Sequence, residues 1–319
     1  MAAQGLGGTA LLGTMTFGDT VDLAAARRIL DAARDCEISS IDTANGYAGT
    51  AAESILGELL VGCRDAVRLA TKAGIPHPDA MGASPLSAVA IDRCLTASLA
   101  RLRTDHVDVF YLHQPDASTP LEETVAGIAE ILRSGKARAW GVSNFASWQL
   151  YRLIELARDA SIPPPIVAQQ LYNVLARRVE DEFVAGSMAA QVSIVAYNPL
   201  CGGLLTGRHH REVVPDRGRF GDSTLAEMYR GRYWHRRMFD GVDQLSEVAA
   251  AAGLSLPEMA FRWVAYRPGV DGVLLGASRP EHVIDNARAL TAGPLPDDVR
   301  LACDRVGDRL WGAMPKYNR

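Results

Sequence analysis

Residues 41–53 read IDTANGYAGTAAE, which is the end of a short apolar strand, a glycine-flanked loop and the start of a helix. The strand ends in Asp42, and Tyr47 follows five residues later in the loop. One unit of strand, loop and helix does not define a fold. The fold depends on how often this unit recurs along the 319 residues.

Short apolar runs alternate with amphipathic segments along the whole chain, which is typical of parallel strands joined by crossover helices. We predict strands at residues 10–14, 39–43, 67–72, 107–113, 139–143, 165–170, 193–198 and 272–276. Eight strands predict an α/β fold of the (β/α)8 TIM-barrel type. The main rival is an open doubly wound sheet, but residues 15–22 read MTFGDTVD and lack the glycine-rich phosphate loop of that fold.

Amphipathic helices are expected between these strands, on the outside of the barrel. We predict them at residues 21–36, 84–102, 119–135 and 147–160, with a last helix starting in the segment GASRPEHVIDN after the eighth strand. Asp22 precedes the first apolar repeat as a candidate N-cap. Pro120 at the start and Gly135 at the end of another segment match the usual asymmetry of helix ends.

The segment between the seventh and eighth strands, from Gly202 to about Val270, is longer than one crossover helix requires. Its second half contains helical patterns at residues 243–255 and 257–267, whereas its first half is rich in Arg, His and aromatic residues. Insertions of that size usually carry function. No repeat or domain boundary interrupts the chain, so we predict one barrel domain over residues 1–319, with this long insertion and a C-terminal tail.

Composition excludes several classes of protein. The net charge of -4, from 33 Lys and Arg against 37 Asp and Glu, gives no general attraction for nucleic acid or an anionic membrane. The chain has neither a long apolar run nor a signal-peptide pattern. Its five cysteines are widely spaced without a metal-ligand motif, which indicates inert thiols in a reducing compartment. We therefore expect a soluble cytoplasmic protein without a metal.

Three of the predicted strands end in residues that could form a proton-transfer site, namely Asp42, Lys72 and His113. Active sites of such barrels form at the C-terminal ends of the strands, so these side chains should meet there with Tyr47. Hydride delivery to a carbonyl builds charge on its oxygen, which requires a proton donor. Tyr47 suits this role if Lys72 lowers its pKa from about 10. Asp42 could hold Lys72 by an ion pair, and His113 could orient the carbonyl.

Each of these four residues alone has an ordinary structural explanation. Asp42 could be a turn former, Tyr47 a surface aromatic, Lys72 a solvated strand end and His113 a structural histidine. Four such residues at the ends of barrel strands are hard to explain by chance. Together they indicate carbonyl reduction.

Seven blocks, in family order and over nearly the whole chain, resemble the aldo-keto reductases. The blocks are IDTANGYAGTAAESILGELL (41–60), LATKAG (69–74), SLARLRTDHVDVFYLHQPD (98–116), GKARAWGVSNF (135–145), AQQLYNVLARRVE (168–180), VAYNPLCGGLLTG (195–207) and GASRPEHVIDNARAL (276–290). The resemblance implies reduction of an aldehyde or ketone to an alcohol by hydride transfer. It places the family's catalytic tetrad on Asp42, Tyr47, Lys72 and His113, with Tyr47 as general acid.

The resemblance also implies a bound nicotinamide cofactor. Ser143, Asn144 and Gln169 would hydrogen-bond the carboxamide, and Tyr197 would stack on the ring; an amide needs paired donors and acceptors, and an aromatic face supports a flat ring. The residues that would surround the pyrophosphate are Asn198, Pro199, Leu200, Gly202, Gly203, Leu204 and Gly207, and the glycines among them let the backbone come close.

Further contacts are implied at the adenosine end of the cofactor. Arg219 would face a cofactor phosphate, and Ser278, Arg279, His282 and Asn286 would meet the 2′-phosphate and the adenine. Arg279 favours NADPH over NADH, because a guanidinium matches a phosphate in charge and geometry. The alternative is that Arg279 is a solvated residue at a helix start.

The block GRFGDSTLAEMYRGRYWHRRMF (218–239) resembles, within the family, the aflatoxin-aldehyde reductase branch, which is also known for succinic semialdehyde reduction. That branch implies a homodimer. It also implies that Tyr229, Arg232 and Arg319 join His113 around an acidic or dicarbonyl substrate. From the sequence, an acidic aldehyde, a dicarbonyl and a ketosugar all stay open as substrates.

A second class of function is compatible with the same residues. The potassium-channel β-subunits of this superfamily retain a similar tetrad, so the chain could be a nonenzymatic accessory subunit that binds a nicotinamide cofactor. We see no additional N-terminal arm for a partner, which favours the reductase.

Overall fold

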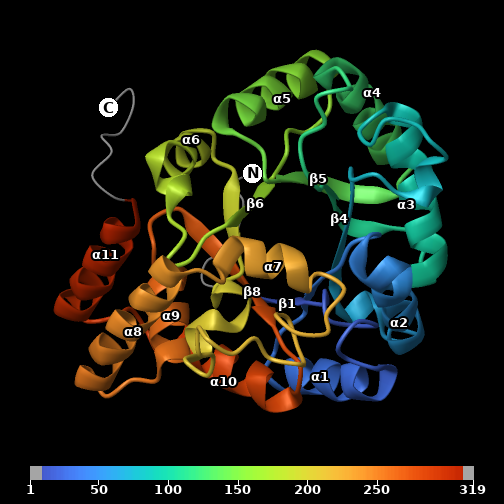
Figure 1. Cartoon of the computed structure of the whole chain (residues 1–319). Coiled ribbons are helices and arrows are strands. Elements are labelled where there is room, and N and C mark those ends of the chain that lie inside the picture. Colours follow the sequence, from blue (N-terminus) through green and yellow to red (C-terminus); the bar gives the residue numbers. More distant parts are fainter. Residues whose placement is uncertain (1–8, 312–319) are drawn as a thin grey trace.

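The structure, a computed structural model, describes residues 9–311 (Figure 1). Within that range eight parallel strands close into a barrel in sequence order. They are β1 (Thr9–Gly13), β2 (Ser40–Asp42), β3 (Arg68–Ala73), β4 (Val107–Leu112), β5 (Ala137–Ser143), β6 (Val167–Leu171), β7 (Ser193–Tyr197) and β8 (Val270–Gly276). Leu11 of β1 pairs with Ser40 on one side and Leu274 on the other, which closes the barrel. The predicted (β/α)8 fold is confirmed.

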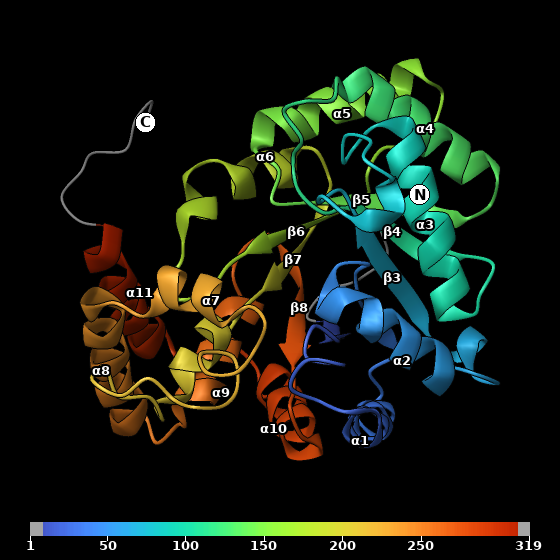
Figure 2. The ribbon, with the colours of Figure 1, turned by 45° about the vertical axis from the view of Figure 1, so that its right-hand side comes forward.

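The helices surround the barrel, as the turned view in Figure 2 shows for α3, α4 and α5 outside their strands. Their bounds are α1 (Leu23–Asp35), α2 (Ala51–Leu59), α3 (Ala88–Leu102), α4 (Leu121–Arg133), α5 (Ser147–Asp159), α6 (Phe183–Ala189), α7 (Ala226–Tyr233), α8 (Arg236–Ala251), α9 (Leu256–Ala265), α10 (Pro280–Thr291) and α11 (Asp297–Trp311). Asp22 caps α1 as predicted, since its Oδ1 accepts the Ala25 N–H at 2.8 Å. Gly135, with φ of 75°, follows the end of α4.

Two predicted helix starts are wrong. The helix predicted from residue 84 begins at Ala88, because the Ser87 N–H donates to Ser84 O in a turn and Ser87 Oγ then caps the helix by accepting the Ala90 N–H at 3.3 Å. The helix predicted from residue 243 begins earlier, at Arg236. Polar side chains on the outer face of that first part hide the apolar repeat in the sequence.

The barrel interior contains an apolar layer below the strand ends. Leu11, Ala70, Tyr111, Val167, Val195 and Leu274 form a cluster separate from the large core between strands and helices. Side chains alternate between the two faces of a strand, so residues two positions further on also point inward. Lys72 lies two residues after Ala70, Gln169 two residues after Val167, and Tyr197 two residues after Val195. The polar layer therefore lies directly above the apolar one, at the C-terminal ends of the strands.

The chain between β7 and β8 crosses this end of the barrel. It begins with a 3₁₀ segment, η5 (Cys201–Thr206), and continues to α7, which Figure 1 shows in front of β1 and β8. Tyr229 of α7 donates through its hydroxyl to Asn198 Oδ1 at 3.2 Å, just after β7. Asp19, in the loop after β1, accepts the Ser223 hydroxyl at 2.5 Å and the Thr224 N–H at 2.9 Å. The segment is thus fixed to both sides of the barrel mouth.

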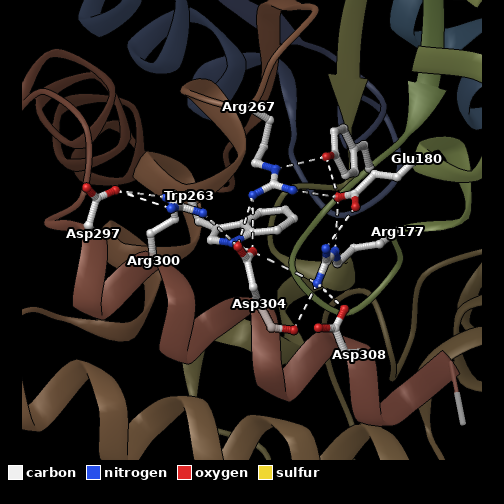
Figure 3. A network of polar contacts seen from close by, with 9 residues as sticks. Arg177, Glu180, Trp263, Arg267, Asp297, Arg300, Asp304 and Asp308 are labelled. Carbon is white, nitrogen blue, oxygen red and sulfur yellow. Dashed lines mark hydrogen bonds and ion pairs between the residues drawn. The ribbon is translucent and has the colours of Figure 1, made fainter. Parts of the chain in front are cut away.

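The tail expected after the barrel contains α11, which the sequence did not predict as a helix. A polar network holds α11 against the rest of the chain (Figure 3). Asp304 accepts from Trp263 Nε1 at 2.9 Å and Arg267 Nη1 at 3.1 Å. Arg177 forms two parallel hydrogen bonds to Glu180, at 2.9 and 2.8 Å, and donates to Asp304 O at 2.9 Å. Because Arg177 follows β6, this network ties α11 to a loop near the polar layer.

Candidate active site

The four residues predicted for proton transfer come together at the C-terminal end of the barrel. Asp42 is the last residue of β2, Lys72 lies near the end of β3 and His113 directly follows β4. Tyr47 begins the 3₁₀ segment η1 (Tyr47–Thr50), which returns the chain after β2 toward the barrel. Parallel pairing of β2, β3 and β4 aligns the first three, and η1 adds the fourth.

Lys72 is the centre of this group and is fully buried. Its Nζ forms an ion pair with Asp42 Oδ1 and donates to Thr43 O at 2.9 Å and to Tyr47 Oη at 3.2 Å. An ammonium group has three N–H donors, so each donor has one acceptor. Burial disfavours the cation, but Asp42 and Tyr47 outweigh burial and raise the pKa of Lys72. Lys72 is therefore charged at neutral pH.

Tyr47 carries the hydroxyl that faces this cation. Burial raises the pKa of Tyr47, and the opposing effect of Lys72 is smaller. The sequence-based expectation that Lys72 lowers this pKa below its ordinary value is wrong in direction, because burial of the phenol dominates. Tyr47 is consequently a protonated donor throughout the neutral range.

His113 lies beside Tyr47, with ring centroids 6.0 Å apart and the rings at 80°. Its Nδ1 is buried and has no hydrogen-bond partner among residues 9–311. Burial, followed by the charge of Lys72, lowers the pKa of His113 to about 3. The imidazole is therefore neutral at physiological pH and can share a hydrogen bond with a carbonyl group.

The lowered pKa of His113 makes a prediction for stability. In the unfolded chain the His113 imidazole takes up a proton near pH 6.5, whereas in the folded chain it stays neutral until about pH 3. Between these two pH values, His113 therefore lowers the free energy of unfolding as pH falls. We expect the free energy of unfolding of the parent, minus that of His113→Gln, to fall by about 1.4 kcal/mol per pH unit below pH 6. Urea unfolding at pH 5, 6 and 7.5 measures this difference. Parallel pH profiles for the two proteins would contradict it.

Four residues expected at the nicotinamide lie at the ends of β5, β6 and β7. Asn144 has a φ of 64°, and its Nδ2 donates to His113 O and Ser143 Oγ, both at 3.0 Å. Tyr197 donates its hydroxyl to Asn144 Oδ1 at 2.6 Å, which fixes the orientation of its ring. Gln169 Nε2 donates to Asp42 Oδ2 at 2.9 Å. Asn144 and Gln169 thus bond directly to the four-residue group, and Ser143 and Tyr197 are joined to it through Asn144.

The turn after β7 has the conformation of a backbone cradle. Gly202, Gly203 and Gly207 have φ of 68°, 107° and 72°, a region that favours glycine. A Cβ on Gly202 would lie 2.5 Å from Tyr229 Cδ1, so this position also requires glycine for space. Leu204 is buried in the core, and only its backbone can face a ligand. Of the other predicted residues, Pro199 is buried and Leu200 packs partly against the core.

Positive side chains gather at two further points around this cradle. After β8, Arg279 Nε donates to His282 Nε2 at 2.9 Å and Ser278 Oγ lies 3.3 Å from His282 Nδ1, while Asn286 is buried on α10. Arg219 lies with its guanidinium 4.9 Å from the centroid of the Tyr229 ring. Its Nη1 is buried without a partner among the described residues. A buried unpaired guanidinium nitrogen is suited to an anion.

Two of the residues predicted for the substrate, Tyr229 and Arg232, lie on α7. Tyr229 is buried, and its hydroxyl is already bonded to Asn198. Burial raises the pKa of Tyr197 to about 12, and Arg232, which faces the same hydroxyl, opposes this rise. Arg232 thus lies beside Tyr197, one of the residues expected at the nicotinamide. Arg319, the fourth residue predicted for the substrate, lies outside the described residues.

Comparison with known proteins agrees with this geometry. The family model described as "Aldo/keto reductase family" matches residues 11–308. This chain belongs to the aldo/keto reductase family. It is an oxidoreductase, and enzymes of this family reduce small carbonyl compounds with a nicotinamide cofactor.

Individual relatives span almost the full length of this reductase. "Aldo-keto reductase family 7 member A3" of Homo sapiens is 34% identical over 97% of the chain and 96% of its own length. "Aflatoxin B1 aldehyde reductase member 2" of Mus musculus is 33% identical over 97% of the chain and 87% of its own length. "Probable voltage-gated potassium channel subunit beta" of Oryza sativa subsp. japonica is 34% identical over 88% of the chain and 86% of its own length. The predicted resemblance to aflatoxin-aldehyde reductases is confirmed.

One buried residue of this reductase has contacts that the sequence did not single out. Asn173, after β6, is fully buried; its Nδ2 donates to Asn198 O at 2.9 Å and its Oδ1 accepts the Ala176 N–H at 2.8 Å. It therefore holds the turn that starts the cradle. Arg208 lies near the same turn, since a Cβ on Gly203 would be 4.0 Å from its Nη2. An asparagine two residues after the end of β6 was the available signal for Asn173.

Two kinds of feature are absent from residues 9–311. No group of three or more His, Cys, Asp or Glu side chains is arranged to hold a metal ion. No helix in the described part of this reductase has the length and apolar content needed to cross a membrane.

Proposed function

We propose that this chain is an NADPH-dependent reductase of aldehydes or ketones in which Tyr47 is the general acid. The observation that carries the proposal is the buried Lys72 cation, which contacts both the Asp42 carboxylate and the Tyr47 hydroxyl. Bound NADPH would supply the hydride. Tyr47 then gives its proton to the carbonyl oxygen, and general acid catalysis of this kind contributes about 10²–10⁴-fold.

The other residues of the group support the proton transfer. Lys72 stabilises the phenolate that Tyr47 becomes, and Asp42 keeps Lys72 charged and in place. His113, which is neutral, hydrogen-bonds the carbonyl and sets its direction. A high pKa for Tyr47 keeps the donor protonated across the neutral range, and proton loss is assisted only when negative charge develops on the substrate.

Several features of the chain fit the proposed cofactor. Ser143, Asn144 and Gln169 would hold the carboxamide and Tyr197 the ring, at the layer where the proton donor lies. The positive-φ glycines after β7 give a backbone surface that a pyrophosphate can approach closely. The buried, unpaired Nη1 of Arg219 provides a cation for one of the phosphates.

Arg279 should decide the choice between NADPH and NADH. It is largely exposed beside Ser278 and His282, with its guanidinium free of any ion pair closer than 3.9 Å among the described residues. A charged hydrogen bond contributes about 1.5–3 kcal/mol, so Arg279→Ala should lower the ratio of kcat/KM for NADPH over NADH by about 10- to 100-fold. Arg288→Ala is the control, because Arg288 lies on the same helix in an exposed pair with Asp285. An unchanged ratio in Arg279→Ala would show that another group reads the 2′-phosphate.

For the substrate, we propose a small acidic aldehyde bound by His113, Tyr229, Arg232 and Arg319. The support is the positive character of the insertion in a slightly acidic chain and the place of Arg232 next to Tyr197. A screen of succinic semialdehyde, 2-carboxybenzaldehyde, dicarbonyls and ketosugars, each with NADPH and with NADH, tests reaction, cofactor and substrate together. Preference for an uncharged ketosugar would contradict the acidic substrate but not the reductase.

The similarity to a probable potassium channel subunit makes a second function testable, that of a nonenzymatic accessory subunit. An accessory subunit would bind NADPH tightly and show negligible turnover over the whole aldehyde panel.

We also propose a cytoplasmic homodimer, by analogy with the aflatoxin-aldehyde reductase branch. Sedimentation equilibrium of the purified protein decides its oligomeric state.

A further inference from the structure

Asp42 uses its two carboxylate oxygens for different partners. Oδ1 forms the ion pair with Lys72 Nζ, and Oδ2 accepts the Gln169 amide N–H at 2.9 Å. Asp42 and Gln169 are only 1% and 3% exposed, so water does not easily replace either partner. In the described barrel β2 and β6 are four strands apart in either direction. The hydrogen bond therefore crosses the interior from one wall to the opposite wall.

The orientation of this carboxylate determines where Lys72 can be. A carboxylate rotates easily about its last side-chain bond, because the preference of that torsion is broad. The ammonium of Lys72 has three acceptors, and Tyr47 Oη at 3.2 Å is a longer contact than Thr43 O at 2.9 Å. If the carboxylate turned, the ammonium would follow Oδ1, and the contact with Tyr47 would be lost first.

We propose that Gln169 is a positioning residue for proton transfer: by anchoring Asp42 Oδ2 it keeps Oδ1 on Lys72 and the third N–H of Lys72 on Tyr47. This inference rests on the proposed function and extends it. It gives Gln169 a role toward Asp42 that is separate from any contact with the carboxamide of the cofactor. The hydroxyl of Tyr111 also faces Gln169, and its ring centroid lies 5.8 Å from Lys72 Nζ. Among the described residues, the Gln169 amide is the donor that bonds Asp42 Oδ2.

The charged and titratable groups around Tyr47 are few and come from separate elements. They are Asp42 and Lys72 from β2 and β3, His113 after β4, Tyr197 from β7 and Tyr229 from α7. Of these groups, only Asp42 is hydrogen-bonded to Gln169 in the described chain. The hydrogen-bonded route from residue 169 to Tyr47 therefore runs through Asp42 and Lys72.

The test compares Gln169→Leu with Gln170→Leu. Gln170 is the next residue of β6; it is also buried, and its Nε2 donates to Phe145 O at 2.9 Å without contacting Asp42. Cofactor-free crystal structures come first, since they contain no nicotinamide. We expect the Asp42 carboxylate to turn in Gln169→Leu and the distance from Lys72 Nζ to Tyr47 Oη to exceed hydrogen-bonding range. An unchanged distance would overturn the proposal.

Kinetics with saturating NADPH and an aldehyde substrate give the second readout. For Gln169→Leu we expect kcat to fall about 10- to 100-fold, as for the loss of one buried charged hydrogen bond, with an increased solvent isotope effect because proton transfer becomes limiting. Gln170→Leu should stay within about threefold of the parent. If Gln169 acts only on the carboxamide, the variant should instead show a higher Kd for NADPH and a larger isotope effect with deuterated NADPH, while the solvent isotope effect stays unchanged. That result would contradict the proposal.

A second variant covers the case in which Gln169→Leu does not fold. Gln169→Glu keeps the size, and its carboxyl can donate to Asp42 only while protonated. A carboxyl beside a carboxylate retains its proton to higher pH than usual. We expect kcat of this variant to approach the parent at low pH and to fall as pH rises; a profile parallel to the parent would overturn the proposal. Absence of turnover in the parent itself would refute the proposed function and leave the crystallographic test valid.

Discussion

Tyr47→Phe should reduce aldehydes at least about a hundredfold more slowly than the parent, because general acid catalysis contributes about 10²–10⁴-fold. Phenylalanine keeps the ring beside His113, so only the hydroxyl that faces Lys72 is removed. Binding of NADPH should be unchanged within about twofold, since no cofactor contact is assigned to this hydroxyl. Steady-state kinetics and fluorescence titration with NADPH measure the two quantities separately.

Tyr151→Phe is the matched control for this loss. Tyr151 lies exposed on α5, and its hydroxyl donates to Gly186 O at 3.1 Å. The control should retain parental turnover. If Tyr47→Phe also reduced an aromatic aldehyde at the parental rate, Tyr47 would not be the proton donor. In the parent, the raised pKa of Tyr47 further predicts no loss of reductase activity from its ionisation below about pH 10.

Lys72→Met should affect both catalysis and folding. The variant leaves the Asp42 carboxylate buried with Gln169 as its remaining side-chain partner. Removing one member of a buried ion pair costs about 3–5 kcal/mol, so the free energy of unfolding should fall by that amount. Turnover should fall at least about a hundredfold, because the phenolate of Tyr47 loses its cation. Urea unfolding and single-turnover reduction of an aldehyde give the two values.

A double variant separates the two effects. Asp42→Asn with Lys72→Met removes both charges and should recover most of the stability but none of the turnover. Arg68→Met, at the exposed start of the same strand, should change stability by less than about 0.5 kcal/mol and leave activity unchanged. Equal stability of Lys72→Met and the parent would mean that Asp42 is protonated or solvated in the folded chain.

The barrel was predictable because its evidence is local. Each buried strand appears as a short apolar run, and residues such as Asp42, Lys72 and His113 end these runs where barrel sites form. Asp22 could be identified as a cap for the same reason. The helix α11 was missed although Val299, Cys303, Val306 and Leu310 pack against the core at helical spacing. Its bonds from Asp304 to Trp263 and Arg267 join distant residues, and the sequence does not show such pairings.

The candidate site was predictable in its residues but not in its energetics. The direction of the pKa shift of Tyr47 depends on how deeply the phenol is buried, and burial is a property of the closed barrel. Gln169 was assigned to the cofactor from its motif, whereas its bond to Asp42 joins residues 127 positions apart. Propensity and spacing describe neighbours along the chain, so contacts across the barrel interior required the structure.

The alternation of side chains along β3 limits how this protein can change in length. Ala70 and Lys72 face the interior, while Thr71 between them points outward and donates to Glu53 of α2 at 2.5 Å. Deleting or inserting one residue of β3 on the N-terminal side of Lys72 would turn the inward-facing side chains outward and the outward-facing ones inward. The ammonium of Lys72 would then leave the site, and the hydroxyl of Thr71 would enter it. Loops at the barrel mouth are free of this constraint. Gains and losses of residues in such a reductase should therefore be confined to the loops at the barrel mouth.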